Sequence, residues 1–246
     1  MYVQVNGGLC NRLRVIFSYK YMIETTKKND KLIILWDIYN KTCLCKFNDF
    51  FENIENVKII YSDNTEFLDI IKTNKEVIKT CSICLDYETY SKNNIYKDLI
   101  LKKDIINIVN NNINKYEKHD YISIHIRNTD HINLRKLKNI VCNNDDYFKF
   151  IDTNLKKNYK LYIASDNKES YDIFYNKYKE YIPYYSFNQK KDLNLLHIKD
   201  NTQHHRHTDI LDAIIDIYMC LKSKKFKGTS YSSYSDLINK LIKENN

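Results

Sequence analysis

The sequence predicts an α/β protein with a mostly parallel sheet in each half of the chain. Short apolar segments alternate with longer segments of helical character, and the alternation begins again near residue 121. A hydrophobic content of 43% and 22 tyrosines exclude a disordered chain. A chain of 246 residues can form one large domain or two lobes of about 110 to 130 residues, each able to bury a core.

The first half contains four short apolar segments that we expect to be strands. Helix-like stretches separate them, and the clearest helix covers residues 10–27. The predicted strands are residues 2–5, 32–36, 57–61 and 77–84.

The second half repeats this rhythm. Strands are predicted at residues 121–126 and 161–164, with a short one around Phe226. Helices are predicted at residues 145–155, 168–178 and 209–221, and at the end of the chain.

A long, polar, helix-like run at residues 99–118 marks the boundary between the halves. We therefore predict two Rossmann-like lobes, residues 1–115 and residues 116–246. In open parallel sheets ligands bind beyond the carboxyl ends of the strands, so these ends are where we expect the functional residues.

Glycine is scarce, and this excludes common nucleotide-binding folds. The chain has only Gly7, Gly8 and Gly228, where average usage gives about 17. A G-x-G-x-x-G motif or a P-loop cannot be written with glycines at these positions, so ordinary dehydrogenases and P-loop kinases are excluded. Where glycine is kept, we expect the backbone to require it.

Arginine is equally scarce, and it falls in a few compact segments where a planar fork would suit phosphate or carboxylate. The formal charge of +8 suits an anionic partner, but scattered lysines supply most of it and indicate a solvated surface. No arginine-rich arm or RNA-binding aromatic platform is present. The arginines are Arg12, Arg14, Arg127, Arg135 and Arg206.

No segment resembles a signal peptide or a membrane-spanning helix, and the seven cysteines are an odd count, so we expect reduced thiols and a cytoplasmic protein. Cys43-x-Cys45 and Cys81-x-x-Cys84 fit no standard zinc ribbon, and no metal site is predicted. The His-rich run at 204–207 is interpreted as a polar loop.

The turn after the first strand carries the first candidate site. Gly7 and Gly8 precede a helix, where free N–H groups favour an anion or a close-lying sugar. A tight turn that binds nothing is an equal alternative, and Asn11 and Arg12 in the first helical turn tilt the balance toward binding.

A second site follows the strand at 121–126. His125 and Arg127 lie two residues apart, hence on one face, and can bind a diphosphate. Asp130 can act as a base, cap the next helix or pair with Arg127, and these alternatives stay open.

Two further segments complete the candidate site. Ser165 and Asp166 end a strand, where a base or ribose could dock, although Asp166 could equally cap a helix. Asp216 lies on the helix at 209–221, before a hydroxyl-rich helix start that can hold phosphate or simply cap the helix. The donor-binding residues predicted at that helix start are Gly228, Thr229, Ser230, Tyr231, Ser232 and Ser233.

Taken in order, these segments resemble the fucosyltransferase superfamily of α1,6-, nodulation and protein O-fucosyltransferases. The stretch 125–131, His-Ile-Arg-Asn-Thr-Asp-His, is similar to the family's His-Val-Arg-Arg-Thr-Asp-Lys, whose first arginine contacts the donor diphosphate. Ala164-Ser165-Asp166 resembles Ala-Thr-Asp, and Asp216 with the Gly228 segment resembles the motif that holds guanine and phosphate. The turn at residues 7–12 resembles the glycine-rich first turn of related enzymes.

The resemblance implies a GT-B-like fold with two lobes facing a central cleft, the acceptor on the side of residues 1–115 and GDP-fucose held mainly by residues 116–246. It also implies metal-independent inverting transfer of fucose from GDP-fucose to a glycan hydroxyl. No cofactor beyond the donor is implied. The catalytic glutamate of the α1,6 enzymes corresponds to Arg135 here, so the base, the acceptor and the linkage stay open. Geometry favours Asp37, after the second strand, with Asp130 second, and Asn11 and Arg127 complete the predicted catalytic set.

Two other classes of protein remain. A non-catalytic nucleotide-sugar or glycan-binding module would keep Arg127 and Ser232 without a base. A nucleic-acid-binding protein, the weaker alternative, would show steep salt dependence and no preference for GDP.

Overall fold

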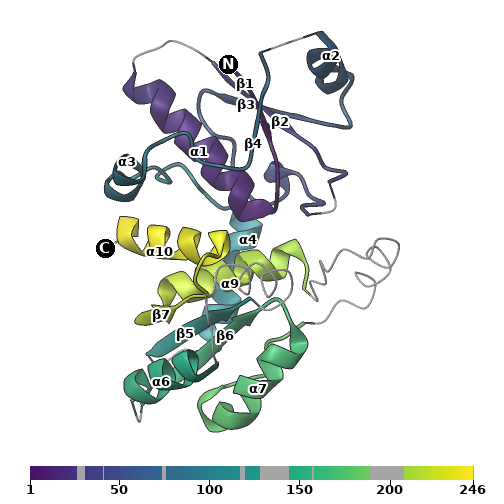
Figure 1. The fold of residues 1–246 in the computed structure, drawn as a ribbon. Helices are drawn as coiled ribbons and strands as arrows, with labels where there is room; N and C mark the ends of the chain where they lie inside the picture. The colour runs from purple at the N-terminus through teal and green to yellow at the C-terminus, as the bar shows by residue number, and fades with distance from the viewer. Residues whose placement is uncertain are drawn as a thin grey trace. The chain divides into compact units, whose positions relative to one another are not determined.

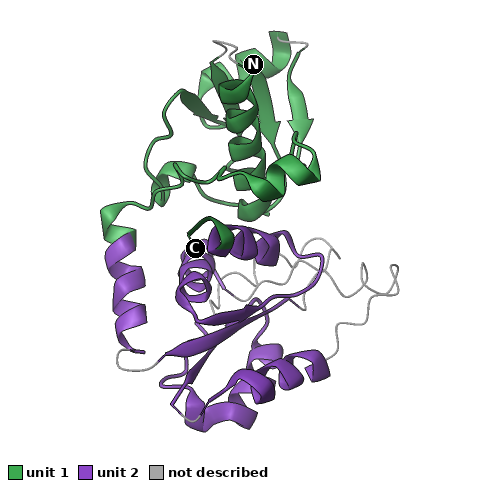
Figure 2. Cartoon of the chain, turned by 90° about the vertical axis from the view of Figure 1, so that its left-hand side faces the viewer, with its two compact units in different colours: residues 1–105, 243–246 green, residues 106–242 purple. Residues whose placement is uncertain are grey.

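The computed structural model divides the chain into two compact units, residues 1–105 with 243–246, and residues 106–242 (Figure 2). Two helices contribute residues to both units, α4 (Lys103–Asn114) and α10 (Ser233–Asn245). The predicted assignment of an acceptor side to 1–115 and a donor side to 116–246 stays a prediction. The structure describes residues 1–26, 31–40, 42–73, 76–116, 120–127, 144–156, 158–188 and 208–245.

Unit 1 contains a four-stranded parallel sheet of order β3-β2-β1-β4 (Figure 1). α1 (Leu9–Thr25) follows β1, and α2 (Thr65–Thr73) packs its buried Phe67 against Leu35 and Ile60 of the sheet. A 3-10 turn, η1 (Phe47–Asp49), and α3 (Tyr87–Lys92) lie in the connections. The strands are β1 (Tyr2–Val5), β2 (Leu32–Trp36), β3 (Val57–Tyr61) and β4 (Ile78–Thr80).

Two predicted elements are shorter in the structure. β4 ends at Thr80. The next carbonyl, that of Cys81, does not continue the sheet because it accepts two hydrogen bonds from the Arg14 guanidinium. The polar run at 99–118 becomes helical only at Lys103, since Leu101 pairs with Phe51 in an antiparallel bridge.

Unit 2 contains a three-stranded parallel sheet of order β6-β5-β7. β5 is the central strand, and all six of its residues are buried because α6 and α7 cover one face and α9 and α10 the other (Figure 1). The apolar pattern of both sheets confirms the predicted α/β fold with parallel sheets. The elements are β5 (Tyr121–Ile126), α6 (Asn144–Asn154), β6 (Lys160–Ser165), α7 (Lys168–Tyr178), η2 (Lys179–Tyr181), α9 (Ile210–Lys222) and β7 (Lys225–Lys227).

The core of unit 2 lies between the sheet and the α6–α7 layer. Ile122, Ile124 and Ile126 of β5 pack there with Ile151 of α6 and Phe174 of α7, all at most 1% exposed. This apolar core holds β5 in place. It therefore also fixes the carboxyl end of β5, where the polar residues follow. Among the described residues, no helix has the length and apolar character needed to cross a bilayer.

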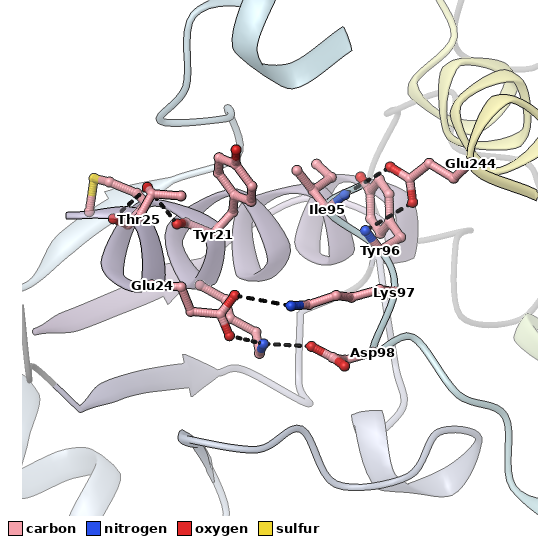
Figure 3. A network of polar contacts seen from close by, with 10 residues as sticks. Tyr21, Glu24, Thr25, Ile95, Tyr96, Lys97, Asp98 and Glu244 are labelled. Atoms are coloured by element: carbon pink, nitrogen blue, oxygen red, sulfur yellow. Dashed lines mark hydrogen bonds and ion pairs between the residues drawn. The ribbon is translucent and has the colours of Figure 1, made fainter. Parts of the chain in front are cut away.

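A polar network ties the end of α10 to the segment 95–98 of unit 1 (Figure 3). The Glu244 carboxylate accepts the main-chain N–H groups of Ile95 and Tyr96, each at 3.0 Å. Nearby, the buried Lys20 ammonium pairs with Glu24 and, at 2.6 Å, with Asp98. The segment 95–98 is therefore held by charged side chains of two helices.

Glu244→Gln should lower the free energy of unfolding by about 1 to 2 kcal/mol, because the amide keeps one acceptor oxygen for two N–H groups and loses the charge. Urea unfolding of the whole chain measures the effect. Glu88→Gln is the matched control, since Glu88 is 73% exposed and pairs only with the exposed Lys92 in the described region. Equal changes in both variants would show that the Glu244 contacts contribute no more than a surface ion pair.

Candidate functional site

The carboxyl end of the unit 2 sheet brings three predicted residues together. The parallel pairing sets His125 beside Ala164 and Ile126 beside Ser165, so Arg127 and Asp166 follow their strands at the same edge. The Nε atom of Arg127 lies 4.0 Å from Oδ2 of Asp166, and the Arg127 side chain is 25% exposed while Asp166 is nearly buried. Arg127 therefore has both a local counter-charge and access to a ligand.

The hydroxyl-rich segment before α10 lies against the end of β5. The main-chain N–H of Arg127 donates to Oγ1 of Thr229 at 2.9 Å. Ser232, fully buried, accepts the main-chain N–H of Asp236 on its carbonyl at 2.8 Å and so starts α10. The N-terminus of this helix thus belongs to the same sheet edge as Arg127, which favours an anion there.

The predicted members of this segment differ in exposure. Thr229 and Ser232 are buried, Ser233 is partly buried and Ser230 is exposed. Tyr231 has a φ of 60° and is 59% exposed. This left-handed conformation is costly for a residue with a side chain, so it marks a segment held in place by its surroundings.

Two cavities adjoin this edge. A small one of about 30 Å³ is lined by His125, Arg127 and Asp166, and a larger one of about 360 Å³ by Tyr162, Tyr184 and other residues. The cavities share Ser165, Thr208 and Asp216. Together they form a continuous polar and aromatic surface that runs from an arginine to a group of tyrosines.

Asp216 lies where these two cavities meet. Its carboxylate accepts a hydrogen bond from the hydroxyl of Tyr162. Burial raises the pKa values of Tyr162 and Tyr184, so both hydroxyls remain protonated donors. Tyr162 was absent from the predicted site, although its position two residues before Ala164 on an apolar strand is the same period-2 signal that selected His125 and Arg127.

In unit 1, Arg12 is buried and connects two strand ends. Its Nε donates to the carbonyl of Gly7 at 2.9 Å and its Nη1 to the carbonyl of Asp37 at 2.8 Å. The guanidinium lies 4.7 Å from the ring centre of Trp36. Burial lowers the pKa of Arg12, against the opposing effects of the nearby Cys43, Cys45 and Asp37. Only Nη2 lacks a partner within the described part of the chain.

Asp37 follows β2 and is held by the end of β3. Its Oδ1 accepts the hydroxyl of Ser62 and the main-chain N–H of Tyr39, each at 2.9 Å. No described residue donates to Oδ2. Ser62 was absent from the predicted site, although it follows its strand as Asp37 does. The pairing of Trp36 with Tyr61 sets the two residues side by side.

The turn at Gly7 requires glycine for two reasons. Gly7 has a φ of 80°, and a Cβ at this position would lie 2.7 Å from Nδ2 of Asn11. The Oδ1 atom of Asn11 is buried and has no partner among the residues described. Gly8 has an extended backbone that any residue adopts, and a Cβ there would come no closer than 3.7 Å to its nearest obstacle.

Several predicted features lie outside the described residues, namely Asp130, Arg135 and the run at 204–207. Within the described residues, no group of three or more His, Cys, Asp or Glu side chains could hold a metal ion. The sulfur atoms of Cys43 and Cys45 lie 3.5 Å apart as thiols.

No protein-family model and no curated protein matches the sequence. The fold matches structures of NodZ α-1,6-fucosyltransferase, one soaked with GDP-fucose at 15% identity and one co-crystallised with GDP at 13%, each with a TM-score of 0.60. A structure of fucosyltransferase NodZ from Bradyrhizobium matches with a TM-score of 0.60 at 13% identity. Each comparison covers 98% of this chain and 92% of the other. The predicted α/β fold is therefore confirmed, and it is the fold of these structures.

Gly228→Ala should lower the free energy of unfolding by about 1 to 3 kcal/mol, because the new Cβ would overpack the start of α10. It would lie 2.5 Å from Cβ of Ser235, which the rest of the helix holds in place. Gly8→Ala is the control, with an expected loss below about 1 kcal/mol at a helix N-cap. Thermal unfolding compares the two, and a Gly228→Ala protein as stable as the control would contradict the steric argument.

Proposed function

We propose that this protein is a glycosyltransferase that binds a nucleoside-diphosphate sugar at the carboxyl edge of the unit 2 sheet. The observation that carries the proposal is the position of Arg127, beside the start of α10 and next to a tyrosine-lined cavity. The arginine and the helix start provide positive charge for a diphosphate, and the cavity of about 360 Å³ provides room for the nucleoside.

Within this class we propose GDP-fucose as the donor. The NodZ structures that share the fold were obtained with GDP-fucose and with GDP, which supports this choice. Asp216 supports it chemically, because its carboxylate can accept hydrogen bonds from the two adjacent N–H donors of a guanine edge. The glycan acceptor and its linkage stay open.

The proposed reaction inverts the configuration at the anomeric carbon of the sugar and needs no metal. The bond from fucose to the departing diphosphate breaks, and Arg127 with the N–H groups of α10 stabilises the charge that develops on the phosphate oxygens. The acceptor hydroxyl forms the new bond on the opposite face of the sugar and gives its proton to a base. Metal-independence is the part of this proposal that rests on charge supplied by the protein itself.

Asp37 is the proposed base. Ser62 and the Tyr39 N–H hold one carboxylate oxygen, which fixes the side chain and, among the described residues, leaves Oδ2 to accept a proton. Asn11 and Arg12 lie in the first turn of α1, which follows the neighbouring strand β1, and Arg12 acts through the Asp37 carbonyl. Asp130 is the second candidate for the base.

GDP should stabilise the protein in the presence of EDTA. At 100 times its dissociation constant, a ligand adds about 2.7 kcal/mol to the free energy of unfolding. Thermal shift with GDP, UDP and ADP, each with EDTA or Mn²⁺, measures this. Arg127→Lys should weaken the GDP response at least tenfold in affinity, because lysine lacks the two-pronged fork. A response to UDP alone, or only with Mn²⁺, would refute the proposed donor site.

Asp37→Asn should reduce fucose transfer by a factor of about 10² to 10⁴ while GDP binding is kept, as expected for loss of a general base. Asp63→Asn is the control, because Asp63 lies after the adjacent strand and pairs with the surface residue Lys46. The assay is release of GDP with a panel of glycan acceptors. Full turnover by Asp37→Asn would exclude it as the base, and donor binding without any turnover by the wild type would favour a binding module.

A further inference from the structure

The hydroxyl of Thr229 takes over where β7 stops pairing with β5. The last paired residues of these strands are Lys227 and Ile124. Beyond them, Oγ1 of Thr229 donates to the carbonyl of His125 and accepts the N–H of Arg127, both at 2.9 Å. One side-chain hydroxyl thus serves the two main-chain groups that a longer neighbouring strand would have paired.

The Thr229 hydroxyl has a third polar partner, the hydroxyl of Tyr147. The Tyr147 hydroxyl lies 2.8 Å from Oγ1 of Thr229 and 3.1 Å from the carbonyl of His125. The Tyr147 hydroxyl also donates to the His125 carbonyl, so either Tyr147 or Thr229 is the donor in the contact between the two hydroxyls. Thr229 is 2% exposed. Its hydroxyl is therefore buried among the protein groups that it contacts.

Thr229 is itself held by the first turn of α10. Its main-chain N–H donates to Oγ of Ser235 at 2.9 Å, and the same Oγ lies 2.7 Å from Nδ1 of His125. Gly228 makes this contact possible, since a Cβ there would occupy the space of the Ser235 side chain. The end of β5, the Gly228–Thr229 turn and the start of α10 are therefore joined through hydrogen bonds on a single pair of hydroxyls.

We infer that Thr229 is a positioning residue, which sets the direction in which Arg127 leaves the sheet. The N–H of Arg127 is fixed by Thr229 directly after the last residue of β5, and this fixes the start of the side chain. The guanidinium then reaches the small cavity beside Asp166. This inference rests on the proposed function, because it assigns Arg127 to a diphosphate. It predicts that the hydroxyl of Thr229, which touches no ligand, still determines diphosphate affinity.

Thr229→Val and Thr229→Ser test the inference, with GDP and inorganic pyrophosphate as probes in titration calorimetry. Valine has nearly the shape of threonine but leaves the Arg127 N–H and the His125 carbonyl without the Thr229 hydroxyl. Serine keeps the hydroxyl. We expect Thr229→Val to weaken binding of both probes at least tenfold and Thr229→Ser to stay within threefold of the wild type.

Two further variants separate positioning from general stability. Tyr147→Phe removes one bond to Thr229 but leaves the Arg127 bond intact, so it should lower the melting temperature without lowering GDP affinity. In an Arg127→Lys background, Thr229→Val should have less than a threefold additional effect, because it acts through Arg127. Equal losses of affinity in Tyr147→Phe and Thr229→Val, or an undiminished Thr229→Val effect in the Arg127→Lys background, would overturn the inference.

A readout without ligand keeps the two proposals distinguishable. Amide exchange of the Arg127 N–H should accelerate in Thr229→Val and stay slow in Thr229→Ser, and unchanged exchange would refute the positioning bond. If Thr229→Val does not fold, Thr229→Ala provides the same comparison. A wild type that binds neither probe would refute the proposed function and this role with it, whereas normal wild-type binding with normal Thr229→Val binding would refute only the role.

Discussion

Main-chain groups at the carboxyl ends of parallel strands must find hydrogen-bond partners once the neighbouring strand has ended, and both candidate sites depend on how side chains supply them. In unit 2 the hydroxyl of Thr229 does so for β5. In unit 1 the guanidinium of Arg12 does so for Gly7 and Asp37. Arg12 and Thr229, which meet this requirement, are buried, whereas Arg127 next to Thr229 stays partly exposed.

This division explains why the two arginines of the candidate sites differ in burial. Arg12 is fully buried and directs its donors into the protein, whereas Arg127 keeps a quarter of its side chain exposed. The scarcity of arginine drew attention to Arg12 and Arg127 alike, but the two residues have different roles in the structure. One arginine holds strand ends together against an aromatic ring, and the other lies at the edge of a cavity with a counter-charge at 4.0 Å.

Most of the fold could be predicted from the sequence because its strands are short, apolar and separated by helices. Apolar periodicity places β5 correctly, but it cannot show that β4 stops at Thr80, since that depends on the distant Arg14. For the candidate sites, the sequence predicted which segments take part but not all of the residues that contact one another. The pairing of Asp37 with Ser62 arises from strand register, which no local pattern in either segment encodes.

Gly228 has a consequence at the level of codons. Every single-nucleotide change that replaces glycine with another residue introduces a Cβ, and here that atom would lie 2.5 Å from the Cβ of Ser235. A second change, to glycine at position 235, would delete the hydroxyl that meets His125 and would still leave the new Cβ 3.1 Å from the Phe226 ring. In a chain with three glycines, this is therefore a position where steric contacts oppose replacement of glycine.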